Sequence, residues 1–190
     1  MWSAGDVRQY AYCPRVPYYR YALPIPYRQT HTMRKGDQTE RAELLLSRRR
    51  SFRRWGLEDA RLEPHPYWMS ERFRLCGIPD AALVTQGKVG ILEFKDSPRG
   101  LTHGTKLQIA AYVLLAGDLY PDCEIVPLFY DPLTGQSIKV RVLDQLKREV
   151  LDIRDALEEM ISSETLPDPT PHTSKCTECE YRRSCGDVVL

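Results

Sequence analysis

Two acidic side chains and a lysine lie mid-chain at a spacing that suits metal-dependent hydrolysis. Asp80 follows a proline, and thirteen residues later the sequence Glu93-Phe94-Lys95 ends an apolar stretch. If Asp80 begins one strand of a hairpin and Glu93 ends the next, both carboxylates reach the same end of a sheet. Strand alternation then places Lys95 on the same face as Glu93, with Phe94 opposite in the core.

A hard divalent ion prefers oxygen ligands, so Asp80, Glu93 and the backbone carbonyl of Phe94 are candidate ligands for Mg²⁺ or Mn²⁺. Lys95 is a candidate to orient or deprotonate the attacking water and to offset charge developing on a phosphate. The alternative is an exposed hairpin in which Glu93 and Lys95 pair at the surface, because lone Glu-x-Lys motifs are common. The preceding Pro79 and the apolar residues 89–92 provide the context for the catalytic interpretation.

A further polar pair lies on a strongly apolar segment, where Gln108 and Tyr112 stand four residues apart. In a helix this spacing puts both side chains on one face. Two polar tips on an apolar helix need partners, and a phosphate or an active-site carboxylate would serve. A core tyrosine with a satisfied hydroxyl explains the same residues, so both interpretations stay open.

Six cysteines are present, and three of them, Cys176, Cys179 and Cys185, lie within ten residues near the end of the chain. Thiolates favour zinc or iron–sulfur clusters, which usually take four protein ligands, and Cys13 is the best candidate for the fourth. Cys76 and Cys123 lie in apolar surroundings and are predicted to be ordinary buried cysteines.

Three states compete for the four grouped cysteines. Disulfides are disfavoured because nothing in the sequence indicates export to an oxidising compartment. A structural zinc site stays open, since Cys-x-x-Cys is its commonest element. The long separation between Cys13 and Cys176 favours an iron–sulfur clasp that joins both terminal segments over a compact zinc ribbon.

The elements that must position these residues follow from periodicity and from breaks in the sequence. Four prolines in residues 11–27 limit that segment to short helical turns. The predicted helices are 37–46, 106–119 and 144–163, and the predicted strands are 71–76, 80–86, 89–94, 124–131 and 137–142. Their order indicates a single mixed α/β domain over residues 1–190.

The composition excludes several classes of protein. The 190 residues carry 27 basic and 26 acidic side chains, so no global field marks a nucleic-acid or membrane partner. No apolar run approaches the ~20 residues of a bilayer span. The first residues lack a signal-peptide pattern, and we expect a soluble cytoplasmic protein with no membrane contact.

Positive charge is nevertheless concentrated around the early predicted helix. The candidates for contacts to a DNA backbone are Arg41, Arg48, Arg49 and Arg50. The candidates for stacking on unpaired bases are Tyr12, Tyr18, Tyr19 and Trp55. The alternative is a solvated, charged helix face.

Taken together, these motifs resemble a known family. Asp80, Glu93-Phe94-Lys95, Gln108-x-x-x-Tyr112 and the four cysteines are similar in order to the RecB-like nucleases, and within them to the CRISPR-associated iron–sulfur exonucleases. The resemblance implies a restriction-endonuclease-like PD-(D/E)xK core, a mixed sheet flanked by helices. It assigns metal binding to Asp80 and Glu93 and catalysis to Lys95. Gln108 and Tyr112 match the last motif of the family.

The resemblance also implies a cofactor and partners. The four cysteines are expected to hold an iron–sulfur cluster, generally 4Fe–4S and in some members 2Fe–2S. Residues 1–30 and 167–190 together are then the cluster subdomain. Family members act on single-stranded DNA ends or overhangs, and they trim and select prespacers for the Cas integrase complex.

One position departs from the family pattern. The first motif usually has a histidine metal ligand four residues after a glycine, whereas here Glu40 follows Gly36 at that spacing. A glutamate is also an oxygen ligand for Mg²⁺, so Glu40 is a candidate. The alternatives are a RecB-like repair nuclease unconnected to CRISPR and a non-catalytic iron–sulfur or zinc DNA-binding module. The sequence leaves the oligomeric state open.

Overall fold

The computed structural model describes residues 1–26, 55–57, 59–94, 100–131 and 136–186. The helices are α1 (Ala4–Tyr12), α2 (Arg15–Tyr21), α4 (His103–Leu119), α5 (Asp144–Ser162) and α6 (Arg182–Cys185), with a 3-10 helix at Thr173–Glu178. The strands are β1 (Trp2–Ser3), β2 (Arg61–Pro64), β3 (Trp68–Ser70), β4 (Leu75–Gly77), β5 (Ala81–Val84), β6 (Lys88–Phe94), β7 (Glu124–Asp131) and β8 (Gln136–Lys139).

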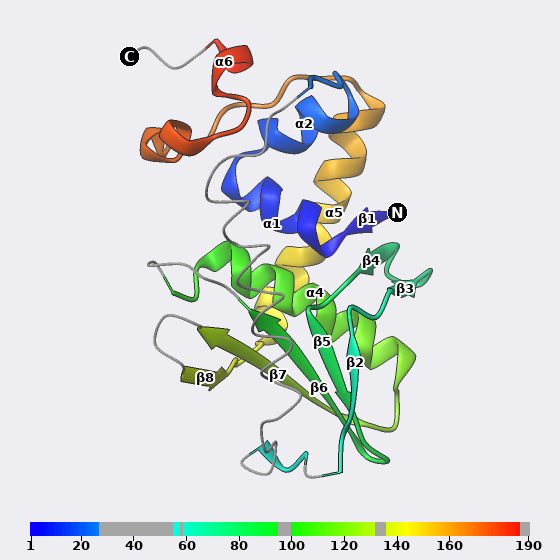
Figure 1. Ribbon diagram of the computed structural model, residues 1–190. Helices are drawn as coiled ribbons and strands as arrows, with labels where there is room; N and C mark the ends of the chain where they lie inside the picture. Colours follow the sequence, from blue (N-terminus) through cyan, green and yellow to red (C-terminus); the bar gives the residue numbers. More distant parts are fainter. Residues whose placement is uncertain (27–54, 58, 95–99, 132–135, 187–190) are drawn as a thin grey trace.

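The main layer is a five-stranded mixed sheet in the order β2-β5-β6-β7-β8 (Figure 1). β6 pairs antiparallel with β5 and parallel with β7. The chain joins β6 to β7 through α4, because a parallel pair needs a crossover that returns to the same end of the sheet. The face of the sheet away from α4 packs in a second apolar cluster that includes Leu83, Leu92 and Leu128.

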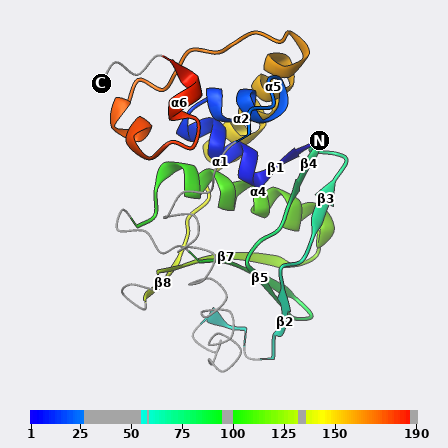
Figure 2. The ribbon, with the colours of Figure 1, turned by 45° about the horizontal axis from the view of Figure 1, so that its top comes forward.

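The long helix α4 lies between the sheet and the layer formed by α1, α2 and α5 (Figure 2). Leu107, Ala111 and Leu115 of α4 are fully buried in one cluster, which also holds Ile91 of β6 and Val150 of α5. This burial on two sides explains why the sequence of α4 is apolar around most of its circumference.

The first residues of the chain join a second, smaller sheet with the order β1-β4-β3. β1 pairs parallel with β4, so that Trp2 lies opposite Leu75. α1 follows at once and begins with a capping box: Ser3 Oγ accepts the Asp6 N–H at 3.0 Å, and the Asp6 carboxylate accepts the Ser3 N–H at 3.0 Å.

The predicted mixed α/β fold is confirmed, and the helices expected at 106–119 and 144–163 correspond to α4 and α5. The strand expected at 71–76 is wrong in its first part, where residues 71–74 form a turn. Ser70 Oγ accepts the Phe73 N–H at 3.2 Å in this turn, and Arg74 has a positive φ of 52°. The helix expected at 37–46 lies outside the described residues.

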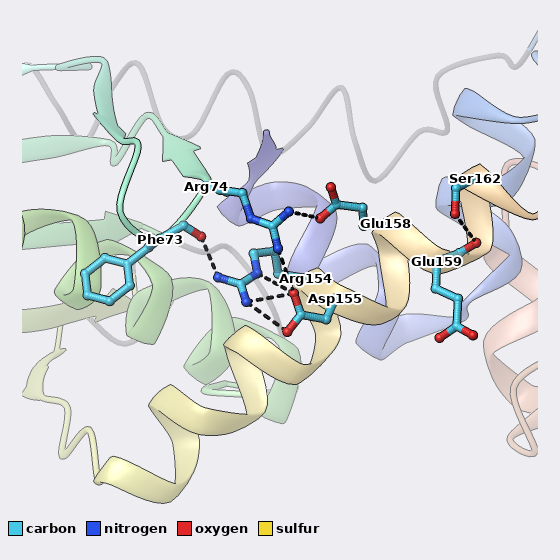
Figure 3. Close-up of polar contacts among 7 residues, drawn as sticks. All are labelled: Phe73, Arg74, Arg154, Asp155, Glu158, Glu159 and Ser162. Atoms are coloured by element: carbon cyan, nitrogen blue, oxygen red, sulfur yellow. Dashed lines mark hydrogen bonds and ion pairs between the residues drawn. The ribbon is translucent and has the colours of Figure 1, made fainter.

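A polar cluster ties this turn to α5 (Figure 3). Arg154 donates to the Phe73 carbonyl at 2.8 Å and to the neighbouring Asp155 carboxylate at 2.8 and 2.9 Å. Arg74 reaches Asp155 at 3.1 Å and Glu158 at 2.5 Å. The Arg154 side chain is 13% exposed and the Arg74 side chain 50% exposed, so water screens the contacts of Arg74 more strongly.

We expect Arg154→Ala to lower the free energy of unfolding by about 1–2 kcal/mol, because it removes a partly buried charged donor from the Phe73 carbonyl. Arg74→Ala should cost less than about 1 kcal/mol, since its ion pairs are half exposed. Urea unfolding of both variants measures the two losses. Equal losses would contradict the greater contribution assigned to Arg154.

Candidate active site

Asp80 and Glu93 lie side by side at one end of the main sheet. The antiparallel register of β5 and β6 places Asp80 directly opposite Glu93, one step beyond the last paired residues. Both side chains are on the sheet face that α4 covers, because Ala82 and Ile91, two positions along each strand, are buried in the α4 cluster. Asp80 is 6% exposed and Glu93 is fully buried.

The backbone of β6 holds Asp80 in place across the strands. The Phe94 N–H donates a short hydrogen bond to Oδ2 of Asp80. The Phe94 ring lies on the opposite face of the sheet, where it packs edge-on against Tyr130 with 5.7 Å between ring centroids. Glu93 and Phe94 therefore alternate as the sequence pattern predicts.

Gln108 and Tyr112 form a hydrogen-bonded pair on α4. Gln108 Nε2 donates to the Tyr112 hydroxyl at 2.9 Å, and that hydroxyl donates to the Ile78 carbonyl at 3.0 Å. Ile78 lies two residues before Asp80, so Tyr112 fixes the backbone that leads to the carboxylate. Gly77 makes room for the ring, since a Cβ there would lie 2.7 Å from Cε1 of Tyr112.

Burial raises the pKa of Tyr112 well above its usual range, and the negative charge of Glu93 and Asp80 raises it further. The hydrogen bond from Gln108 and the positive charge of Arg8 act in the opposite direction. The Tyr112 hydroxyl thus keeps its proton at any physiological pH and acts as a donor. The same balance shows that both carboxylates and Arg8 lie within electrostatic range of one phenol.

Several predicted site residues lie outside the described residues: Lys95, Glu40, Arg41, Arg48, Arg49 and Arg50.

The donor set of the site fits a hard divalent ion. Asp80 and Glu93 provide carboxylate oxygens, and two carboxylates this close in an apolar setting repel each other unless a cation or proton intervenes. Within the described part of the chain, no three His, Cys, Asp or Glu side chains converge on a point that could hold a metal ion. A complete ligand set therefore draws on a group beyond these two side chains, such as the Phe94 carbonyl or Glu40.

The four cysteines singled out from the sequence line one small cavity. Cys13, Cys176, Cys179 and Cys185 surround about 60 Å³, and each is a free thiol. They are not preassembled as a metal-binding group in the described residues. Four thiols around one cavity nevertheless match the donor set of a zinc ion or an iron–sulfur cluster.

The other two cysteines correct the prediction that both are buried. Cys76 and Cys123 are each half-buried. Cys76 alternates along β4 with the buried Leu75 and Gly77, so its side chain is on the outer face of the small sheet. Cys123 lies in the connection between α4 and β7, at the edge of the main core.

The first and last described segments are bonded to each other around the cysteine cavity. Arg15 Nε donates to the Pro167 carbonyl at 2.8 Å, and its Nη1 lies 3.5 Å from Sγ of Cys185. Lys175 Nζ donates to the Tyr12 carbonyl at 3.0 Å, and the Tyr12 hydroxyl donates to the Lys175 carbonyl. The contacts of Arg15 were not predicted from the sequence, although its place two residues after Cys13 was a signal.

The tyrosines of this region pack within the protein. Tyr19 is 5% exposed and lies against Tyr181 with 5.5 Å between ring centroids, so its prediction as a base-stacking residue is wrong. The Tyr18 hydroxyl donates to the Glu164 carbonyl at 3.1 Å. Trp55 packs against the cluster on the far side of the sheet.

Burial is the main cause that raises the pKa of Cys179 to about 11, the charges of Glu180, Cys13 and Cys176 contribute to the rise, and a hydrogen bond with the Tyr181 backbone opposes it. Below this pH the metal-free thiol is protonated, so a metal that binds its sulfur must displace the proton. We expect the affinity of the metal-free protein for Co²⁺ to rise with pH, by up to about tenfold per unit for each proton released. Charge-transfer absorbance titrated at several pH values measures this, and an affinity independent of pH would contradict it.

Comparison with known proteins identifies the family. The sequence profile of the PD-(D/E)XK nuclease superfamily matches residues 32–186. The CRISPR-associated exonuclease Cas4 of Francisella tularensis subsp. novicida (strain U112) is 30% identical over 182 residues, which cover 95% of this chain and 91% of the relative. The chain belongs to the Cas4 family. The CRISPR-associated exonuclease Cas4 of Thermoproteus tenax is 28% identical over 184 residues, covering 96% of this chain and 92% of that relative.

Membership of the Cas4 family confirms the prediction of an exonuclease, and so of a hydrolase. A structural likeness supports the fold: the crystal structure of SSO0001 superposes with a TM-score of 0.52 and 14% identity, over 85% of this chain and 73% of that one. In the described parts of the Cas4-family chain, no helix is long and apolar enough to cross a membrane.

Proposed function

We propose that this Cas4-family chain is a divalent-metal-dependent deoxyribonuclease that degrades single-stranded DNA from its ends. The observation that carries the proposal is the pair Asp80 and Glu93, which are buried and directly opposite each other on adjacent strands. The hydrogen bond from Phe94 to Asp80 and the Gln108–Tyr112–Ile78 chain keep these carboxylates in register. A surface hairpin would need none of these buried contacts.

In this proposal Asp80, Glu93 and the Phe94 carbonyl hold Mg²⁺ or Mn²⁺, with Glu40 as a further candidate ligand. The bound ion supplies a Lewis acid at the phosphate and makes its bound water more acidic. Lys95 orients or deprotonates the attacking water and offsets charge on the phosphate.

Tyr112, which keeps its proton, holds the backbone before Asp80 and does not exchange protons with the substrate. The candidates that guide the DNA backbone toward the site are Arg41, Arg48, Arg49 and Arg50.

We further propose that the cysteine cavity holds an iron–sulfur cluster, 4Fe–4S or 2Fe–2S, with Cys13, Cys176, Cys179 and Cys185 as ligands. The support is that all four thiols line one cavity and that Arg15 and Lys175 already bond the first segment to the last. Residues 1–30 and 167–190 then make one cluster subdomain. A structural zinc ion is the alternative occupant of the same thiols.

The biological role that we propose is the trimming and selection of prespacers in the cytoplasm, with the Cas integrase complex as partner. Its support is that the relatives are named CRISPR-associated exonucleases. A repair nuclease unconnected to CRISPR is the competing role, and co-purification of the chain with the integrase from cells that express both distinguishes the two.

The test of the activity compares linear single-stranded DNA, labelled at one end, with circular single-stranded DNA, labelled internally. Both are incubated in Mn²⁺ and in EDTA. We expect degradation of the linear strand in Mn²⁺ only, with the circular strand intact. DNA that is bound but never cleaved, in Mn²⁺ or Mg²⁺, would overturn the nuclease proposal. Equal cleavage of circular DNA would overturn its restriction to ends.

A further inference from the structure

Arg8 lies on the face of α1 that packs toward α4, where a charged side chain calls for an explanation. Ala4 and Val7 on this face are fully buried in the main core. Arg8 follows Ala4 by four residues and so shares its face. The side chain runs past the first turn of α4, since a Cβ at Gly104 would lie 3.4 Å from Cγ of Arg8.

The guanidinium of Arg8 is incompletely satisfied. Its Nε is buried and has no hydrogen-bond partner among the described residues. A buried donor on a charged group is costly when nothing accepts from it. The positive charge also lies close enough to Tyr112 to act on its hydroxyl, as do the charges of Asp80 and Glu93. Arg8 therefore brings a cation with an unpartnered Nε donor within electrostatic range of the same phenol that both carboxylates act on.

Arg8 also lines a cavity of about 720 Å³, which lies between α1, the first turn of α4 and residues 168–172. Of the three other basic residues in its lining, His103, His172 and Lys175, two are already engaged. Lys175 donates to the Tyr12 carbonyl at 3.0 Å, and His103 lies 2.7 Å from the Glu149 carboxylate. Arg8 is thus a cation of this lining whose Nε has no hydrogen-bond partner among the described residues, and an anion in the cavity would meet its positive charge.

We propose that Arg8 binds a phosphodiester of the substrate strand, and that this cavity receives the strand. The planar fork of a guanidinium matches two phosphate oxygens, which gives orientation as well as charge. The identification of the ligand as a DNA strand rests on the proposed nuclease function. α1 precedes residue 32, where the superfamily profile begins to match, so Arg8 lies outside the part of the chain that the profile covers.

The first experiment measures binding of a labelled single-stranded oligonucleotide at several salt concentrations, with Ca²⁺ in place of Mn²⁺ and cleavage checked to be absent. Each phosphate contact to a single strand contributes roughly 0.7 to the slope of log Kd against log salt. Arg8→Gln should lower the slope by about this amount. Arg8→Lys should keep the slope, and the exposed Arg148→Gln on α5 is the matched control. An unchanged slope in a folded Arg8→Gln variant would overturn the proposal.

The second experiment measures kcat/KM on the same strand in Mn²⁺. Arg8→Gln should lower it by roughly tenfold to a hundredfold, the size of a hydrogen bond to a charged group, and Arg8→Lys by less. Wild-type kcat/KM in folded Arg8→Gln would overturn the role at the site. If Arg8→Gln does not fold, neutral methylphosphonate linkages scanned along the strand test the wild type. A neutral linkage at the position that Arg8 contacts should weaken binding by the wild type more than binding by Arg8→Lys. Equal effects on the two proteins at every position would contradict the contact.

The two experiments separate this inference from the proposed function. A wild type that binds the strand with an Arg8-dependent slope but never cleaves it would remove the nuclease proposal and leave the phosphodiester site standing. A wild type that cleaves the strand with no dependence on Arg8 would remove the phosphodiester site and leave the nuclease proposal standing.

Discussion

Asp80→Asn should reduce metal-dependent cleavage of single-stranded DNA by roughly 10²–10³-fold or more, since it removes one of two carboxylates proposed to hold the ion. The substitution is conservative in shape. An asparagine oxygen can still accept from the Phe94 N–H, so the bond between the strands is retained. The loss of activity would then reflect the loss of charge at the site. Single-turnover cleavage of an end-labelled strand in Mn²⁺ measures it.

The same variant has a second expected property, which separates a metal site from an ordinary structural pair. Asp80 and Glu93 are both buried and repel each other when ionised, so neutralising Asp80 should raise the melting temperature in EDTA. In Mn²⁺ the wild type should have the higher melting temperature of the two, because it gains the binding energy of the ion. Asp122→Asn, on an exposed turn, is the matched control and should change neither value. Undiminished cleavage by Asp80→Asn would remove Asp80 from the site.

Cys13→Ala should abolish iron binding, because it deletes the one proposed ligand that lies outside the last segment of the chain. Purified without oxygen, the wild type should be brown, absorb at about 400 nm and contain iron and sulfide. The variant should be colourless and should melt earlier, since the first and last segments lose their shared centre. Cys76→Ala is the control, because Cys76 is also a thiol but lies on the small sheet.

The results for metal content discriminate between the occupants of the cysteine cavity. A colourless wild type with stoichiometric zinc would replace the cluster with a structural zinc site on the same thiols. Full retention of iron in Cys13→Ala would exclude Cys13 as a ligand. Iron lost equally from Cys76→Ala would show that the loss follows from instability.

Local pattern was enough to predict the elements that carry the carboxylates and the tyrosine. β6 is an apolar run buried on both faces, and because neighbouring side chains of a strand point to opposite faces, Glu93 and Phe94 were placed on opposite sides of the sheet. α5 repeats its apolar residues at helical spacing. α1 was missed, although Ser3 and Asp6 form a capping box, because its own apolar stripe is short and includes Arg8. β1 and β3 have two and three residues, too few for any periodicity, and they exist only through their pairing with β4.

The parts of the site that depend on contacts between residues close in sequence could be predicted. The hairpin distance between Asp80 and Glu93 is local, whereas the approach of Arg8 to Tyr112 depends on how α1 packs on α4. Likewise, the contact between Arg15 and Cys185 joins residues from the two ends of the described chain. The burial assigned to Cys76 failed for a related reason, because an apolar neighbourhood in sequence does not tell which face of a small sheet is covered.

The packing of α1 on α4 also sets an order for folding. α1 and α2 are synthesised first, but the surfaces that cover them, α4, α5 and the last segment, follow more than about 80 residues later. Val7 and Val16 are thus exposed on the nascent chain until those partners have left the ribosome. The sheet with α4 can form earlier from contacts closer in sequence, so we expect the terminal segments to close last and to leave the chain open to chaperones until then.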